Sequence, residues 1–230
     1  MQIGFDVIGD LYLEPDESFN WENKVTSLYC LVAGNISSDL RIVLQTLLHL
    51  GKLYQGVYYI PGPLEYKNCK NIENRTTQLF KLCNKIPRIT MLHNHVVLID
   101  GLAILGVNGW YNEFVTFENS LAIDTERYSD FKYLSNSIEK LQKHLDVRKI
   151  LILSASVPKT ELYFGEKPKI EGLDIMLPYA LEYDTESKVK YWVFGTYKKI
   201  VDITLDDINY INNPYFKRNP YWAKRINVEI

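Results

Sequence analysis

The chain has 230 residues, of which 47% are hydrophobic and 23% charged, so its composition is that of an ordinary globular protein that can bury a sizeable core. Its 26 basic and 28 acidic residues give a formal net charge of -2, which excludes a strong overall field drawing it to nucleic acid or to an anionic membrane. The longest apolar run is interrupted by Asp100 and Gly101 and falls short of the roughly 18 to 20 residues of a membrane span.

The cysteines and the N-terminal residues predict a cytoplasmic protein. Cys30, Cys69 and Cys83 are an odd set without metal-ligand spacing, so we expect reduced thiols. The first ten residues lack the basic start and apolar stretch of a signal peptide. Asn, Lys, Ile and Tyr are abundant, which fits A+T-rich coding in a phage or a low-GC bacterium.

The first half of the chain alternates short apolar runs with helical patterns. Buried strands are predicted at 3–9, 27–34 and 56–62, and helices at 39–52 and 74–85. The apolar face of the first helix comprises Leu40, Val43, Leu44, Leu47 and Leu48, with an N-cap among Ser37, Ser38 and Asp39 and an end at Gly51.

The second half predicts further strands and one long helix. Residues 95–100 and 102–107 form a hairpin across Gly101, and a helix at 129–146 leads to a strand at 149–155. Four short apolar runs follow, and we expect them to complete a second sheet: 190–195, 199–205, 207–213 and 225–230. No linker or repeat is visible, so residues 1–230 are expected to form a single domain of α/β (α+β) class, with two packed mixed sheets flanked by helices.

Ligands in such layered folds bind beyond the carboxyl ends of strands, so the residues after each apolar run are informative. These segments are GDLYLE (9–14), AGNIS (33–37), PGPLEY (61–66), SASVP (154–158) and FGTYKK (194–199). In this order they resemble the motifs of the calcineurin-like metallophosphoesterases, which are D-x-H, G-D, G-N-H-D/E, a lone His after a strand, and G-H-x-H. Residues 94–111 and 211–230 resemble that family's strand pair with its Trp loop and its closing segment. The resemblance implies a four-layer sandwich of the metallophosphoesterase type.

The family's enzymes hold two divalent metals, but most ligand positions differ in this sequence. By resemblance, Asp10 stands at the first aspartate, and the other ligand positions are occupied by Tyr12, Asn35, Pro63, Leu64, Ala155 or Ser156, Thr196 and Lys198. Glu65 matches an outer acidic position and is interpreted as structural. One carboxylate cannot bridge two dications, so we predict a degenerate former metal site with no metal, no cofactor and no catalytic residue.

Two interpretations of the remaining charges stay open. Lys198 either replaces the metal as the counter-charge of Asp10, or both side chains point into solvent. The histidines match no ligand segment; His49 and His144 are interpreted as caps of helix C-termini, and a metal pair of His93 with His95 is disfavoured because no acidic or cysteine partner lies nearby in sequence.

The C-terminal stretch interleaves rings with cations and is a candidate interaction surface, formed by Tyr215, Phe216, Lys217, Arg218, Tyr221, Trp222, Lys224 and Arg225. Such a pattern fits nucleic-acid binding, a protein contact, or plain packing of the closing loop. We predict a catalytically inactive protein that binds an unknown protein partner and no membrane. The alternative is a residual phosphoesterase, or a binder of a phosphate ligand or nucleic acid.

Overall fold

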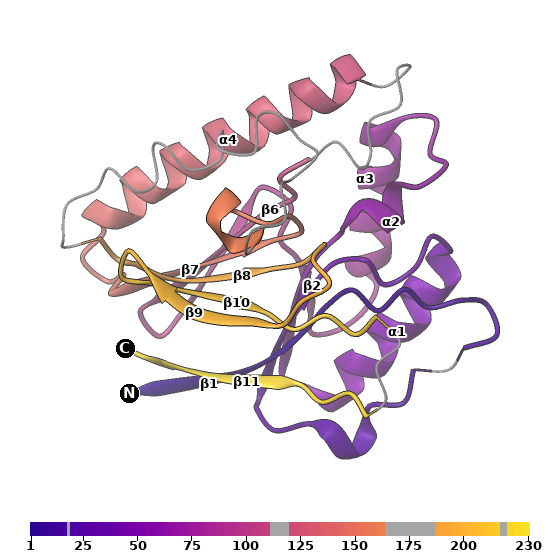
Figure 1. Cartoon of the computed structure of the whole chain (residues 1–230), viewed down its shortest axis with the longest axis horizontal. Helices are drawn as coiled ribbons and strands as arrows, with labels where there is room; N and C mark the ends of the chain where they lie inside the picture. The colour runs from indigo at the N-terminus through magenta and orange to yellow at the C-terminus, as the bar shows by residue number, and fades with distance from the viewer. Residues whose placement is uncertain (18, 111–119, 164–186, 217–219) are drawn as a thin grey trace.

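The fold is described from a computed structural model, which covers residues 1–17, 19–110, 120–163, 187–216 and 220–230. Two mixed β-sheets pack face to face, and helices cover both outer faces (Figure 1). The predicted fold class is therefore confirmed.

The first sheet has the strand order β11-β1-β2-β3-β4. Its strands are β1 (Gln2–Ile8), β2 (Tyr29–Ala33), β3 (Gly56–Ile60), β4 (Ile89–Met91) and β11 (Lys224–Glu229). β1 to β4 run parallel, and β11 runs antiparallel to β1 with Gln2 opposite Glu229. The expectation that the last run joins the second sheet is wrong, because Ile226 and Val228 of β11 are buried beside β1.

The second sheet has the order β5-β6-β7-β8-β10-β9. Its strands are β5 (His95–Ile99), β6 (Leu102–Val107), β7 (Lys149–Ser154), β8 (Val189–Phe194), β9 (Val201–Leu205) and β10 (Ile208–Asn212). The four inner strands are parallel, and the predicted hairpin across Gly101 is confirmed as β5 and β6. A core of apolar residues from both sheets lies between them.

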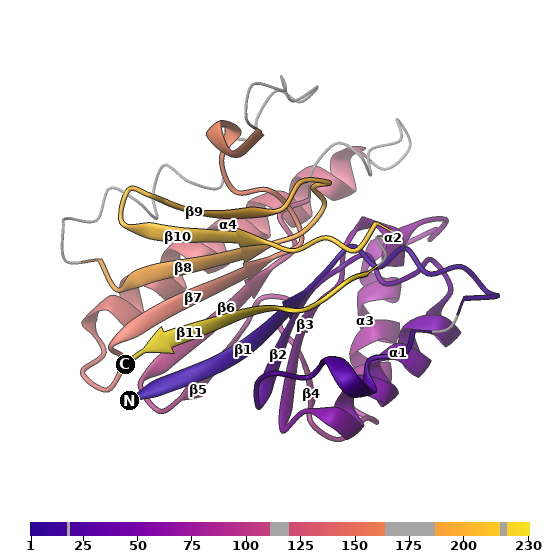
Figure 2. The ribbon, with the colours of Figure 1, turned by 60° about the horizontal axis from the view of Figure 1, so that its bottom comes forward.

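The helices divide unequally between the two outer faces (Figure 2). α1 (Leu40–Leu53) and α3 (Ile72–Cys83) cover the first sheet, the short α2 (Pro63–Tyr66) follows β3, and α4 (Ser120–Lys143) covers the second sheet. Two 3-10 turns, η1 (Glu22–Lys24) and η3 (Thr160–Tyr163), complete the described elements. None of the helices in the described part of the chain combines the length and apolar character needed to cross a bilayer.

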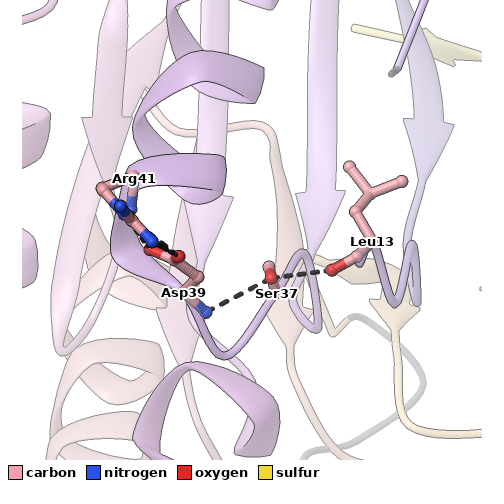
Figure 3. A network of polar contacts seen from close by, with 4 residues as sticks. All are labelled: Leu13, Ser37, Asp39 and Arg41. Carbon is pink, nitrogen blue, oxygen red and sulfur yellow. Dashed lines mark hydrogen bonds and ion pairs between the residues drawn. The ribbon is translucent and has the colours of Figure 1, made fainter. Parts of the chain in front are cut away.

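The start of α1 follows the sequence prediction, but its end does not. The Asp39 carboxylate accepts a hydrogen bond from the backbone N of Arg41 (2.8 Å), and the Ser37 hydroxyl links Asp39 N to the carbonyl of Leu13 (Figure 3). α1 continues through Gly51 to Leu53. A Cβ on Gly51 would lie 3.0 Å from the carbonyl oxygen of Pro87, so this glycine serves the close packing of α1 rather than its termination.

The two sheets approach each other closely beside their strand ends at Gly195. This residue follows β8, and a Cβ placed on it would lie 2.0 Å from the carbonyl oxygen of Ala33, the last residue of β2. A backbone atom cannot move aside as a flexible side chain does. Only glycine therefore lets the loops of the two sheets meet here.

We predict that Gly195→Ala lowers the free energy of unfolding by about 2 to 3 kcal/mol, because the added methyl forces the sheets apart. Gly4→Ala is the matched control, since its Cβ would meet the Ser27 side chain at 3.2 Å. Urea denaturation of both variants measures the effect, and equal midpoints for the two would contradict the packing described here.

Candidate functional site

The segments predicted from the sequence converge on one edge of the two sheets. Asp10, Asn35 and Leu64 follow β1, β2 and β3, while Ala155 and Thr196 follow β7 and β8. A continuous set of hydrogen bonds joins all five residues. The geometry thus brings together residues that lie up to 186 positions apart.

Asp10 is at the centre of this network. Its carboxylate is fully buried, and Oδ1 accepts hydrogen bonds from Nδ2 of Asn35 (2.7 Å) and from the backbone N of Thr196 (2.9 Å). Oδ2 accepts from the backbone N of Tyr197 at 3.3 Å. Donors from both sheets therefore compensate the desolvation of this carboxylate.

The orientation of the Asn35 amide is fixed by its neighbours. The backbone N of Leu64 donates to Oδ1 of Asn35 (2.9 Å), so the NH2 group faces Asp10 and the Thr196 hydroxyl oxygen, 3.1 Å away. The Thr196 hydroxyl in turn donates to the carbonyl of Ala155. Asn35 consequently presents hydrogen atoms, rather than a lone pair, to the centre of the site.

Lys198 lies at the rim instead of pairing with Asp10. Its side chain is exposed, and its ammonium stands 5.9 Å from the ring centroid of Phe216. The ring of Tyr12 also contacts Phe216, stacking on it with a centroid distance of 4.7 Å. Among the described contacts no ion pair joins Lys198 to Asp10, so the counter-charge hypothesis is not supported.

The backbone of the site is strained at four residues that carry side chains. Asp10, Tyr12, Asn35 and Thr196 have φ values of 52°, 49°, 56° and 57°. Such left-handed conformations cost on the order of 1 to 3 kcal/mol each and persist only where the surrounding structure enforces them. The hydrogen bonds to Asp10 and Asn35 supply that enforcement.

Glu65 joins the loops that follow β2 and β3. Its buried carboxylate accepts from the backbone N of Asn35 (3.1 Å), of Ile36 (2.6 Å) and of Gly62 (2.8 Å). Burial raises the pKa of Glu65 to about 7, although these backbone donors favour the charged form. Glu65 positions the two loops, as its structural interpretation expected.

The contacts of the other predicted site residues indicate roles in the local structure. Pro63 is the first residue of α2, where a missing N–H costs nothing, and Leu64 beside it is half-buried. Ser156 is buried, and its carbonyl accepts from the Ser154 hydroxyl. Among the described residues, no three His, Cys, Asp or Glu side chains gather closely enough to hold a metal ion.

The C-terminal candidate surface is not one continuous row of exposed groups. Tyr221 is buried and its hydroxyl donates to the carbonyl of Asn213 (2.7 Å), so it packs the closing loop. Trp222 is 59% exposed, with the Lys24 ammonium 5.7 Å from its ring.

The remaining members of that surface differ in their accessibility. Tyr215 and Phe216 are half-buried, Lys224 pairs with Asp202, and Arg225 is exposed. Lys217 and Arg218 lie outside the described residues.

A second polar cluster, which sequence reasoning missed, lies beside the first. Nδ1 of His93, after β4, is 2.5 Å from Oδ1 of Asn108, and Asn108 donates to the carbonyl of Pro61 (2.6 Å). Asp130 of α4 is fully buried and accepts from the backbone N of Gly109 (2.8 Å). Burial raises the pKa of Asp130, and His93 opposes that shift. The sequence carried one signal for this cluster, because His93 lies at the end of a strand, as the other site residues do.

His49 is also placed differently from its prediction. Its Nε2 accepts a hydrogen bond from the backbone N of Trp21 (3.1 Å), so it holds the segment before η1 rather than capping α1. His144 does lie just after α4, where its Nδ1 accepts from the backbone N of Asp146 at 3.3 Å.

Comparison with known proteins identifies the fold. The chain has the metallophosphoesterase fold. The phosphopantetheinyl hydrolase of Mycobacterium tuberculosis superposes with a TM-score of 0.65 at 14% identity, over 98% of this chain and 96% of that one. GAP50 of Plasmodium, described as the anchor in the inner membrane complex, superposes with a TM-score of 0.56 at 12% identity, over 93% of this chain and 71% of that one.

Sequence comparison extends less far. No family model matches the chain. Protein L509 of Acanthamoeba polyphaga mimivirus is 21% identical over an alignment of 146 residues, and the match covers 56% of this chain. The match covers 52% of L509, so the chain spans about half the length of this curated relative. The identities are too low to transfer an activity, and the assignment of individual residues to metallophosphoesterase motif positions stays a prediction.

We predict that Asn35→Asp destabilises the protein at pH 7 by about 2 to 3 kcal/mol, because it replaces the amide donor beside Asp10 with a second buried carboxylate. The loss should shrink as the pH falls and the two carboxyl groups share a proton. Thermal unfolding between pH 4 and pH 8 measures this. Asn23→Asp at an exposed position is the control, and identical pH profiles for the two variants would contradict the assigned contact.

The buried carboxyl group of Asp130 leads us to predict a second pH dependence of the free energy of unfolding. Its folded-state pKa of about 6 exceeds its ordinary value of 3.8, so the folded state binds the proton more tightly. The Asp130 carboxyl group contributes its full stabilisation below about pH 4, and this contribution is lost as the pH rises through 6. The loss amounts to about 1.4 kcal/mol per unit of difference between the folded-state and unfolded-state pKa values. Asp130→Asn should flatten this part of the stability profile, whereas Asp124→Asn, exposed on the same helix, should leave it unchanged.

Proposed function

We propose that this protein has the metallophosphoesterase fold without a working dinuclear metal site, and that it acts by binding another protein. The single observation that carries the proposal is the Asn35 amide, whose NH2 group is directed at Asp10. A bridging metal ligand at this position would have to offer lone pairs to cations. Asn35 instead offers hydrogen-bond donors.

The remaining residues do not fit a pair of divalent cations either. Both carboxylate oxygens of Asp10 already accept hydrogen bonds from N–H groups. The Thr196 hydroxyl is committed to the carbonyl of Ala155, and Leu64 has no ligand atom in its side chain. Two dications about 3.5 to 4 Å apart need several anionic or imidazole ligands, which this set lacks.

The side chains at the rim of the Asp10 site also favour binding over catalysis. Tyr12 and Phe216 stack beside the network, and Lys198 places a positive charge over the same ring. A cation at this rim repels metal ions. Exposed Trp222 and Arg225 belong to the residue types that dominate protein interfaces, and they lie near the C-terminal end of the same closing segment.

Another protein of this fold supports a role in assembly. GAP50 is described as an anchor in a membrane complex, whereas the mycobacterial structure is that of a hydrolase. The fold therefore accommodates both kinds of role. For this chain, the chemistry of the Asp10 site favours a role in assembly over hydrolysis.

Manganese-dependent hydrolysis of bis-p-nitrophenyl phosphate, measured together with the metal content of the purified protein, tests the proposal. We expect no bound manganese and the same background rate for the native protein and for Asp10→Ala. Turnover that Asp10→Ala abolishes would establish a phosphoesterase and refute the proposal.

The binding role has its own test. Proteins captured from the native host with the native chain should be lost with Trp222→Glu and retained with the control Leu145→Glu, which changes a 96% exposed leucine elsewhere. Salt-sensitive binding of a single-stranded oligonucleotide, weakened by Lys217→Ala and Arg218→Ala together, would instead favour the nucleic-acid alternative.

A further inference from the structure

His49 of α1 makes a hydrogen bond that requires its ring to be neutral. Its Nε2 is 3.1 Å from the backbone N of Trp21, and a backbone N–H group can only donate. Nε2 must therefore present a lone pair, which leaves the ring hydrogen on Nδ1. Histidine side chains gain a second proton between about pH 5 and 8, so this contact is open to control by pH.

The contacts of the other three histidines do not depend on protonation in this way. Nδ1 of His93 is 2.5 Å from Oδ1 of Asn108, whose NH2 group donates to a backbone carbonyl. Nδ1 of His93 is therefore the donor, and this bond persists when the ring becomes charged. Nδ1 of His144 accepts from the backbone N of Asp146 in an exposed turn, where water can replace the ring, and His95 is exposed.

The residue that His49 holds is fully buried, so water does not replace the ring as the partner of the Trp21 backbone N. The indole Nε1 of Trp21 donates to the hydroxyl of Tyr54 (2.7 Å), which donates to the buried carboxylate of Asp6 (2.8 Å). Asp6 also accepts from the backbone N of Thr26 (2.8 Å). The Asp6 network and His49 are thus two separate anchors of one segment, and a buried donor left without its acceptor is costly.

The charged groups around this contact do not replace it after protonation. A carboxylate beside the ring would hold a charged imidazole in place, but among the described contacts no acidic side chain pairs with His49. The nearest charged residues along the two packed elements are Lys52 on α1 and Glu22 and Lys24 beside Trp21. Glu22 is exposed, and the ammonium of Lys24 stands 5.3 Å from the centroid of the Trp21 ring. Protonation therefore leaves two N–H donors facing each other.

We propose that His49 is a pH-sensitive latch for residues 19–25. The neutral ring holds this segment against α1; at mildly acidic pH the half-buried, charged ring turns outward and the segment loosens at Trp21. The segment includes η1 and Lys24, whose ammonium is 5.7 Å from the ring centroid of exposed Trp222. The latch therefore also controls one contact of the candidate interaction surface. It makes no use of the former metal site and stands independently of the proposed function.

Hydrogen exchange at the backbone amide of Trp21, measured by NMR on the full chain at pH 5 and pH 7.5, tests the latch. Protection factors are used, because they correct for the intrinsic pH dependence of exchange. We expect the native protein to show about tenfold less protection at pH 5, since losing one hydrogen bond to a buried group shifts a local opening equilibrium by about that factor. Protonation of Asp130 stabilises the folded protein as the pH falls, so the effect of Asp130 on global unfolding runs in the opposite direction.

Two substitutions at His49 separate a latch from a merely structural contact. His49→Gln keeps an acceptor that does not titrate, so Trp21 should stay protected at both pH values. His49→Ala removes the acceptor, so protection at both pH values should fall to the level of the native protein at pH 5. The control His144→Gln should preserve the native difference. Equal protection of the native protein at the two pH values overturns the proposal, as does a pH dependence that His49→Gln leaves intact or a His49→Ala variant that is protected like the native protein.

Discussion

A buried carboxylate must be hydrogen-bonded or neutralised, and the Asp10 carboxylate meets this requirement with amide donors. Asn35 and the backbone of Thr196 and Tyr197 supply them. These donors come from strand ends of both sheets, so the contact joins the two halves of the fold. The same contact directs N–H groups to the place where the family resemblance would put metal ligands, and the proposed lack of metal chemistry follows from it.

The rest of the fold is arranged to keep this contact. Gly195 lets the loop after β8 approach the end of β2, which brings Thr196 within reach of Asp10. Glu65 fixes the loops after β2 and β3, and so orients the backbone N of Leu64 toward Asn35. The left-handed conformations of Asp10 and Asn35 are maintained by these bonds. Strain, close approach and hydrogen bonding therefore act on the same few residues.

Much of this arrangement could be predicted from the sequence, because parallel strands deliver their following residues to one edge. The positions of Asp10, Asn35 and Thr196 were found in this way, as was the hairpin across Gly101. The hydrogen-bonding partners of Asp10 could not be predicted, because the sequence pattern does not show whether a lysine side chain or a backbone amide faces the carboxylate. The polar cluster that contains half-buried His93 and buried Asp130 was missed for a similar reason, since α4 and the end of β4 meet only in three dimensions. The pairing of β11 with β1 likewise depends on contacts between the two ends of the chain.

The most direct measurement of the central claim is anomalous diffraction from crystals grown in manganese. The account predicts no anomalous peak within ligand distance of Asp10, and electron density that keeps the Asn35 amide between Asp10 and the backbone N of Leu64. One or two manganese peaks bound by Asp10 and Asn35, with that amide rotated to present its oxygen, would contradict it.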